Sequence, residues 1–193
     1  MIKSKNLNLR ALEKHDLPFL HRLHNDSNTM SYFFEEPFET VRELEDLYEK
    51  HVHNQMERRF ILQEISSGNS VGVLSILEIN EINRNGEIDI IIDERFRGNG
   101  FGKEGFVLGT KYAFDILNLH KLYLQVLPTN IAGRKIYEYI GYKKEARLRQ
   151  EYYVDGKYID VLRMYIFDQS WRRIKKTLNA RYEFDKKIPQ DQN

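Results

Sequence analysis

The sequence predicts an α/β (α+β) fold, with one mixed, mostly antiparallel sheet and helices on its faces. Two observations predict this fold. Hydrophobicity that alternates with a period of two identifies strands, and capping residues identify the starts of the helices between them. The resulting order is one strand, two helices, three strands, a helix, a strand, a helix and two final strands. Short turns join the three consecutive strands, which makes them antiparallel neighbours.

The first half of the chain holds the first strand, two helices and the three-stranded meander. Asp16 can cap the first helix, and Thr40 with Glu43 forms a capping box for the second. The irregular segment between these helices contains an aromatic run followed by acids. The expected elements are a strand at 7–12, helices from 16 to about 24 and from 40 to about 55, and strands at 59–65, 71–80 and 86–93.

The second half of the chain opens with a glycine-rich turn. Asn130 can cap a short helix that Gly141 can end, and Asp155-Gly156 is typical of a hairpin turn. The expected elements are the turn at 95–103, a helix at 100–117, a strand at 121–127, a helix at 130–140 and hairpin strands at 142–154 and 158–167. We expect one domain over residues 1–170 and a basic appendage, helical or mobile, over 171–193.

The composition excludes several classes of protein. The chain has 193 residues, enough for one domain, and its 41% hydrophobic and 31% charged residues are typical of globular proteins. It has no cysteine, which removes disulfides, zinc–thiolate sites and cysteine nucleophiles and fits a reducing cytosol. No apolar run reaches the roughly 20 residues that span a bilayer, and the start lacks the apolar core of a secretory signal. We expect a cytoplasmic protein with no membrane partner.

Charge is balanced overall but unevenly distributed. The 30 basic and 29 acidic residues give a net charge of +1, which predicts no nucleic-acid partner. Seven acids lie between Glu35 and Glu49, whereas the C-terminal tail is basic. The acidic segment fits a cationic ligand, and the aromatic run before Glu35 and Glu36 can add cation–π contacts. A solvated, charged helix is the alternative interpretation.

Three alternate glycines, Gly98, Gly100 and Gly102, lie where a strand is followed by a helix. Without side chains the backbone can approach a ligand closely, and the free N–H groups of a helix start attract phosphate. Arg97 and Lys103 would add cationic contacts. The turn therefore predicts a phosphate or pyrophosphate ligand, and a flexible turn without a ligand is the alternative.

Two common nucleotide motifs do not fit this turn. The P-loop pattern requires a glycine where Arg97 stands and Ser or Thr where Glu104 stands. The dinucleotide fingerprint is matched by Gly100, Gly102 and Gly105, but it also requires an acid at the end of the next strand, which ends in Leu127-Pro128-Thr129. The antiparallel meander before the turn also disagrees with a doubly wound nucleotide-binding fold.

The pattern that remains is [Arg/Gln]-x-x-Gly-x-[Gly/Ala], held by Arg97, Gly100 and Gly102. With the preceding apolar strand, the helix that begins at Asn130 and its Tyr137, it resembles the acetyl-CoA signature of GNAT N-acetyltransferases. The resemblance implies the GNAT fold, with splayed strands, acetyl-CoA as co-substrate, and a pyrophosphate and pantetheine arm bound mainly by backbone groups. The cofactor-binding residues it implies are Ile90, Ile91, Ile92, Arg97, Gly98, Asn99, Gly100, Phe101, Gly102, Lys103, Asn130 and Arg134.

Direct attack of an amine on the thioester requires one group that accepts a proton and one that donates a proton. Asn130, Arg134 and Tyr137 share one helical face, which we expect to lie toward the thioester. A phenol is protonated at neutral pH and can donate to the departing thiolate, so Tyr137 is the candidate general acid. Glu87, which opens the strand beside the turn, is the candidate base, and capture of an already neutral amine is its alternative.

Segments outside the glycine turn closely resemble the bacterial spermidine N-acetyltransferases. They include the residues 30–37, 47–53, 57–60, 78–80 and 117–121 and the pair Arg163-Met164, and the resemblance spans about residues 7–167. It implies a polyamine substrate, a homo-oligomer, commonly a dodecamer, and a Mg²⁺ ion held by Glu35 and Glu78. It also implies a second, allosteric polyamine site between subunits. The residues expected to bind polyamine are Met30, Glu35, Glu36, Glu43, His51, Val52, His53 and Asn54.

Three residues depart from that family. Asn54 stands where an acid is usual, Ser75 replaces a glutamate, and Asp89 replaces an uncharged polar residue. Each departure bears on polyamine selectivity and leaves the cofactor motif intact. Two other functions stay open, which are N-terminal acetylation of a ribosomal or other protein and a non-enzymatic polyamine or CoA sensor.

Overall fold

A computed structural model describes residues 2–30, 32–33, 38–51, 54–154 and 156–184. Within these residues one mixed eight-stranded sheet forms the centre of the fold, in the order β1-β2-β3-β4-β5-β6-β8-β7. Every neighbouring pair is antiparallel except β5 and β6, which are parallel. The strands are β1 Ile2–Lys3, β2 Leu7–Ala11, β3 Arg58–Glu64, β4 Ser70–Asn80, β5 Asn85–Ile92, β6 Lys121–Val126, β7 Lys143–Val154 and β8 Lys157–Phe167.

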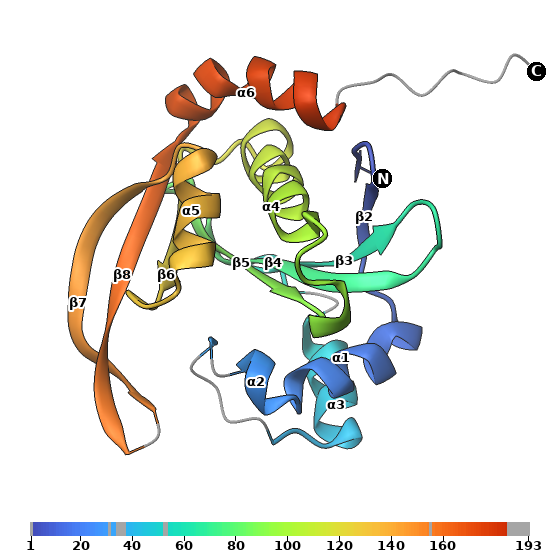
Figure 1. Cartoon of the computed structure of the whole chain (residues 1–193). Helices are drawn as coiled ribbons and strands as arrows, with labels where there is room; N and C mark the ends of the chain where they lie inside the picture. Colours follow the sequence, from blue (N-terminus) through green and yellow to red (C-terminus); the bar gives the residue numbers. More distant parts are fainter. Residues whose placement is uncertain (1, 31, 34–37, 52–53, 155, 185–193) are drawn as a thin grey trace, which may run out of the picture.

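Helices cover both faces of the sheet, as Figure 1 shows. Three lie on one face: α1 Leu17–His24, α2 Ser27–Met30 and α3 Val41–His51. Three lie on the other: α4 Phe101–Lys111, α5 Ile131–Tyr139 and α6 Asp168–Tyr182. The predicted mixed sheet with helices on its faces is confirmed, and short elements such as β1 and α2 are additions to the predicted order.

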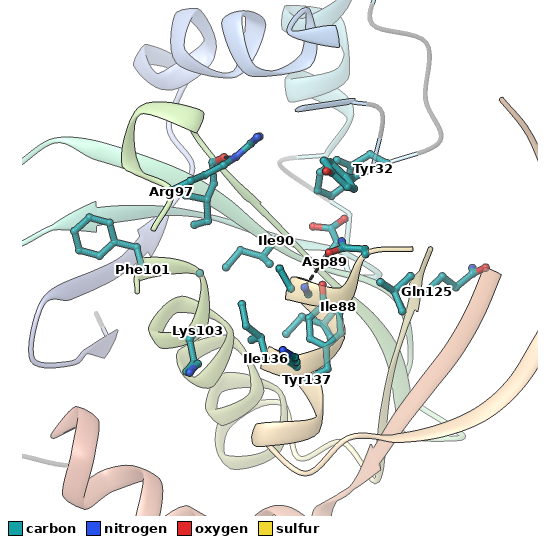
Figure 2. Close-up of a pocket in the computed structure, with 18 of the residues that line it drawn as sticks. Tyr32, Ile88, Asp89, Ile90, Arg97, Phe101, Lys103, Gln125, Ile136 and Tyr137 are labelled. Carbon is teal, nitrogen blue, oxygen red and sulfur yellow. Dashed lines mark hydrogen bonds between the residues drawn. The ribbon is translucent and has the colours of Figure 1, made fainter. Parts of the chain in front are cut away.

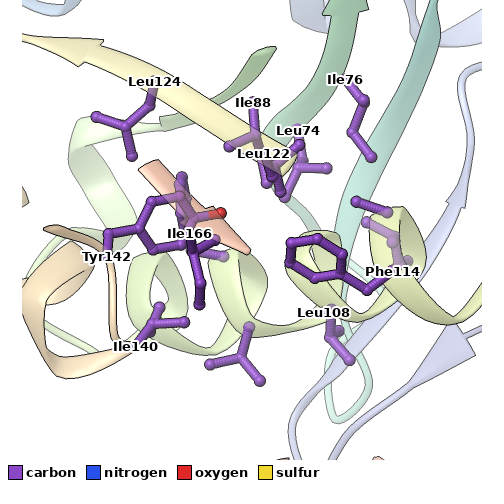
Figure 3. Packing of buried hydrophobic residues seen from close by; sticks show 14 of the residues in the cluster. Leu74, Ile76, Ile88, Leu108, Phe114, Leu122, Leu124, Ile140, Tyr142 and Ile166 are labelled. Carbon is purple, nitrogen blue, oxygen red and sulfur yellow. The ribbon is translucent and has the colours of Figure 1, made fainter. Parts of the chain in front are cut away.

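The alternating strand pattern divides the buried side chains between two cores. Leu62, Leu74 and Ile88 belong to the main core under α4, α5 and α6, whereas Ile61, Val73 and Ile91 belong to the smaller core under α1 and α3. Neighbouring residues of a strand point to opposite faces, so β3, β4 and β5 each contribute to both cores. Figure 3 shows the main core, where Leu74, Ile88, Leu122 and Ile166 of the sheet meet Leu108, Phe114, Ile140 and Tyr142.

Strands β5 and β6 pair over a short distance only. The paired residues are Asn85 with Lys121, Gly86 with Leu122 and Glu87 with Tyr123. Beyond Glu87 the two strands no longer share a register, so they separate toward their C-terminal ends. The backbone groups of β5 that face this opening are therefore available to a ligand, because no neighbouring strand pairs with them.

The segment after residue 170 differs from the expected appendage. Trp171 is fully buried, and Leu178, Tyr182 and Phe184 also belong to the main core. Helix α6 therefore packs as part of the same core, and the expected division near residue 170 stays a prediction that this packing does not favour. Helix α3 spans Val41–His51 and Asn54 lies outside it, so the predicted extent to residue 55 was too long. Among the described helices none is long and apolar enough to cross a bilayer.

Candidate active site

A cavity of about 790 Å³ opens where β5 and β6 separate. Its lining comes from the glycine turn, from both strands, from α5 and from the segment after α2. Figure 2 shows Arg97 and Phe101 on one side of this space, Gln125 on the other, and Ile136 and Tyr137 on the helix between them. The cavity therefore brings together most of the residues that the sequence assigned to the cofactor and both residues that it assigned to the chemistry.

The glycine turn presents backbone to the cavity. Gly98 and Gly100 have positive φ angles of 82° and 85°, a conformation that favours glycine. No atom lies within 4 Å of a Cβ added at either position, so both flank open space. Gly100 caps α4, whose first N–H groups have no partner within the helix and can bind an anion. The turn thus has the geometry of a phosphate site.

The cationic residues of the turn have different environments. The Arg97 guanidinium donates to the Ile92 carbonyl at 3.1 Å and to the Thr29 hydroxyl at 2.7 Å, which ties the turn to α2. Arg97 and Lys103 both line the cavity. Asn99 does not line it, and its side-chain amide donates instead to the Phe96 carbonyl at 3.4 Å.

Two predicted residues of helix α5 line the cavity. Asn130 is the N-cap residue of the helix, and Tyr137 lies within it. The Asn130 side chain accepts from the Gly133 N–H at 2.9 Å, so it caps α5 while lining the cavity. Tyr137 lines the cavity and packs on Phe106 with ring centroids 4.7 Å apart. Burial, with a smaller contribution from the charge of Asp89, raises the pKa of Tyr137 to about 12. Its hydroxyl is therefore protonated at neutral pH and can donate a proton.

Besides Asn99, two further predicted cofactor residues, Ile91 and Arg134, do not line the cavity. The Ile91 side chain lies in the smaller core on the opposite face of the sheet, whereas Ile90 and Ile92 line the cavity. Of the three residues expected on one helical face, Asn130 and Tyr137 line the cavity and Arg134 does not. Arg134 donates to the Pro128 carbonyl at 3.1 Å and lies 4.0 Å from the Glu138 carboxylate.

Three carboxylates lie at the strand side of the cavity, namely Glu78, Glu87 and Asp89. Burial, followed by the charges of Glu78 and Asp89, raises the pKa of Glu87 from its ordinary value of 4.5 to about 7. The Tyr123 hydroxyl donates to Glu78 at 2.6 Å. Glu78 lies at an irregular register between β4 and β5 and has a positive φ of 50°, which directs it differently from a regular strand residue. Burial makes the charged form of a carboxylate costly. A cationic ligand in the cavity would therefore stabilise the charged form of these three carboxylates.

Sequence reasoning missed the polar side chains of the final strands. Gln125 and Tyr152 line the cavity, and the Tyr152 hydroxyl donates to the Gln125 side-chain oxygen at 3.4 Å. The Arg163 guanidinium lies over the Tyr123 ring, 3.9 Å from its centroid. The alternation of Tyr123 and Gln125 along a strand interpreted as apolar was the signal that could have identified them.

The profile described as "Acetyltransferase (GNAT) domain" matches residues 6–143, which include the turn, the splayed strands and Tyr137. The chain belongs to the GNAT acetyltransferase family. Its GNAT fold and its acetyltransferase class, expected from the glycine motif, are confirmed.

Similar GNAT proteins cover nearly the whole chain. The spermidine N(1)-acetyltransferase of Vibrio cholerae serotype O1 is 44% identical over 168 residues, which cover 87% of this chain and 96% of the relative. The protein of the same name from Escherichia coli K12 is 38% identical over 177 residues, with 92% and 94% covered. The V. cholerae enzyme in complex with CoA and spermine superposes with a TM-score of 0.84 at 44% identity, covering 86% of this chain and 98% of that structure.

The structure describes four of the eight residues that were expected to bind polyamine. Met30 is buried in the smaller core, and the Glu43 carboxylate accepts from the Thr40 backbone N–H and hydroxyl, both at 2.8 Å, as a capping box. His51 contacts the Glu57 carboxylate at 2.8 Å, and the Asn54 side chain accepts from the Met56 N–H at 2.9 Å. The remaining members lie outside the described residues: Glu35, Glu36, Val52 and His53.

Of the two residues expected to hold Mg²⁺, the structure describes one. Glu78 lines the cavity, with one carboxylate oxygen accepting from Tyr123, while Glu35 lies outside the described residues. The part of the chain that the structure describes has no cluster of three or more His, Asp or Glu side chains that could hold a metal ion. Glu78 alone does not supply a set of ligands for Mg²⁺, so metal binding stays a prediction.

Proposed function

We propose that the chain transfers the acetyl group of acetyl-CoA to a primary amine of a polyamine such as spermidine or spermine. The observation that carries this proposal is the trio Glu78, Glu87 and Asp89 in the same cavity as the glycine turn. Three carboxylates in a partly enclosed space suit an acceptor with several ammonium groups. The names of two similar enzymes, and the spermine bound to the V. cholerae structure, support the same acceptor.

Aromatic side chains complement this acidic part of the cavity. Tyr32 and Phe33 line it from the segment after α2, and Tyr32 keeps 47% of its surface exposed. In Figure 2, Asp89 is drawn between Tyr32 and the helix that carries Tyr137. An ammonium near these rings would gain cation–π attraction in addition to its ion pairs.

Donor binding follows from the turn and the separated strands. The N–H groups at the start of α4 would hold the pyrophosphate, as at other helix N-termini. The backbone of β5 beyond Glu87 would bind the pantetheine arm in the manner of an added strand. This placement brings the thioester to the level of Tyr137, between the two strands.

The reaction then needs two proton transfers. The neutral amine attacks the thioester carbonyl, so that a C–N bond forms and the C–S bond breaks. Glu87 accepts the proton that the amine loses, through a water molecule, and Tyr137 donates its phenolic proton to the departing thiolate. Solvent then restores both groups. The raised pKa of Glu87, about 7, makes it a stronger base than an ordinary carboxylate.

Allosteric regulation and assembly into an oligomer are proposed separately from the catalytic steps. A second polyamine site between subunits, a homo-oligomer and a bound Mg²⁺ ion remain proposals that come from the family resemblance. No catalytic step above depends on them.

Spermidine turnover across pH tests the proposal and the role of Glu87 together. With acetyl-CoA saturating, kcat/KM for spermidine should fall as pH drops below about 7, because protonated Glu87 cannot accept the proton of the amine. Glu87→Gln should lower kcat/KM at pH 8 by about 10²-fold and remove the inflection near 7, while the amine's own titration stays visible. Release of CoA thiol gives the rates.

Glu64→Gln, on β3 and outside the cavity lining, is the matched control and should keep the wild-type profile. An inflection near pH 7 that persists in Glu87→Gln would remove Glu87 as the base. An absence of thiol release with spermidine at every pH would overturn the proposed function itself.

A further inference from the structure

The aromatic ring of Tyr139 lies near two cationic side chains from different helices. The Lys103 ammonium of α4 is 4.6 Å from the ring centroid, and the Arg181 guanidinium of α6 is 5.6 Å from it. Arg181 also donates to the Tyr139 hydroxyl at 3.3 Å. Tyr139 is 40% exposed, so this group, the Tyr139 platform of Lys103, Tyr139 and Arg181, is open to solvent.

The Tyr139 platform continues the cavity outward. Lys103 belongs to both, because it lines the cavity and contacts the ring. Lys135 also lines the cavity and precedes Tyr139 by four residues on α5, so the two side chains share one helical face. A ligand whose pyrophosphate sits on the glycine turn would therefore meet these side chains on leaving the cavity.

In the part of the chain that the structure describes, the cations of this region have no acidic partner. Within the described ranges, Lys103, Lys135 and Arg181 form no ion pair with a carboxylate. Nearby acids are engaged elsewhere: Glu138 lies 4.0 Å from Arg134, and Glu104 accepts from Ser4 and Asn6. By contrast, Lys111 and Lys175, on the same helices α4 and α6, both pair with Asp115. Unpaired cations around an exposed ring suit a ligand that is both anionic and aromatic.

Packing holds Arg181 in place. It lies one residue before Tyr182, which is buried in the main core together with Trp171 and Leu178 of the same helix. Burial and a hydrogen bond with Tyr139 keep the pKa of Tyr182 above its usual range. The end of α6 is thus attached to α5 at the residue that forms the platform, which limits the entropy lost when a ligand binds.

We propose that the Tyr139 platform binds the 3′-phosphorylated adenosine end of acetyl-CoA, with Arg181 of the C-terminal helix as a determinant of cofactor affinity. Adenine stacks on the exposed ring, and the 3′-phosphate pairs with Arg181 and the neighbouring lysines. Residues 168–182 lie beyond the 6–143 match to the GNAT family, so this contact is an addition to the turn. The inference rests on acetyl-CoA as the donor of the proposed function and needs no particular acceptor.

Calorimetric binding of CoA and of 3′-dephospho-CoA, without any amine, tests the platform. Arg181→Ala should weaken CoA binding about fivefold, the range of one exposed charge pair, and leave the affinity for 3′-dephospho-CoA unchanged. Arg181→Lys should keep most of the preference for the 3′-phosphate. Arg172→Ala, exposed near the other end of α6, is the matched control and should bind both ligands as the wild type does.

The ratio of the two affinities separates the proposal from a general loss of structure. Damage to the fold would weaken the binding of both ligands by the same factor, and that outcome in Arg181→Ala would overturn the proposal. A wild-type ratio in Arg181→Ala would overturn it as well. A chain that binds CoA with the predicted preference but acetylates no polyamine would contradict only the proposed function.

Discussion

Replacement of Tyr137 by phenylalanine is expected to lower kcat for spermidine acetylation by about 10²-fold, the range of a lost general acid. The change removes only the hydroxyl, so the ring still packs on Phe106 and the cavity keeps its shape. The thiolate must then leave without a proton from the enzyme. Because Tyr137 has a pKa of about 12, its hydroxyl is the protonated donor throughout the neutral range. Single-turnover thiol release at saturating acetyl-CoA measures the chemical step.

Binding separates this effect from damage to the cofactor site. The affinity of Tyr137→Phe for acetyl-CoA should match that of the wild type. Tyr153→Phe, on the exposed β7–β8 hairpin at 64% exposure, should show neither change. Wild-type turnover in Tyr137→Phe would show that another group, or water, protonates the thiolate.

Replacement of Trp171 by alanine is expected to lower the free energy of unfolding by about 3–5 kcal/mol, as for other buried tryptophans. Trp171 is fully buried and stacks between Phe114 and Phe184, with centroid distances of 6.3 and 6.1 Å. Its indole N–H donates to Asp115 at 3.1 Å. The change therefore leaves a cavity, and it also leaves an Asp115 oxygen without its donor. Urea unfolding gives the free energy.

Arg172→Ala at the neighbouring, exposed position should change the free energy of unfolding by less than about 0.5 kcal/mol. A loss of similar size in both variants would mean that α6 contributes to stability through its charge. A wild-type free energy of unfolding in Trp171→Ala would instead support the appendage that the sequence predicted after residue 170.

The order of elements and the cofactor turn could be predicted from the sequence because their signals are local. Gly98 and Gly100 occupy positive-φ positions that glycine favours, and the Asn130 cap lies three residues before the N–H that it accepts from. The separation of β5 and β6 followed from the same motif through the family resemblance. These features depend on residues that are close in the chain.

Other features depend on residues far apart in the sequence, so periodicity could not predict them. The packing of α6 depends on contacts from Trp171 to Phe114, which are far apart in the sequence, whereas the placement of Ile91 in the smaller core follows from local strand alternation with Ile90. The acidic trio was missed as a unit because Glu78 comes from β4 and the others from β5. Only the register between these strands places Glu78 near Glu87.

A competition among acceptors tests the central claim most directly. The chain is incubated with acetyl-CoA and an equimolar mixture of spermidine, spermine and a peptide with a free N-terminus, and the products are identified by mass spectrometry. Acetylated polyamine as the dominant product is the result that three carboxylates in the cavity predict. Acetylated peptide as the dominant product, or no acetylated acceptor at all, would contradict the assignment of this chain as a polyamine acetyltransferase.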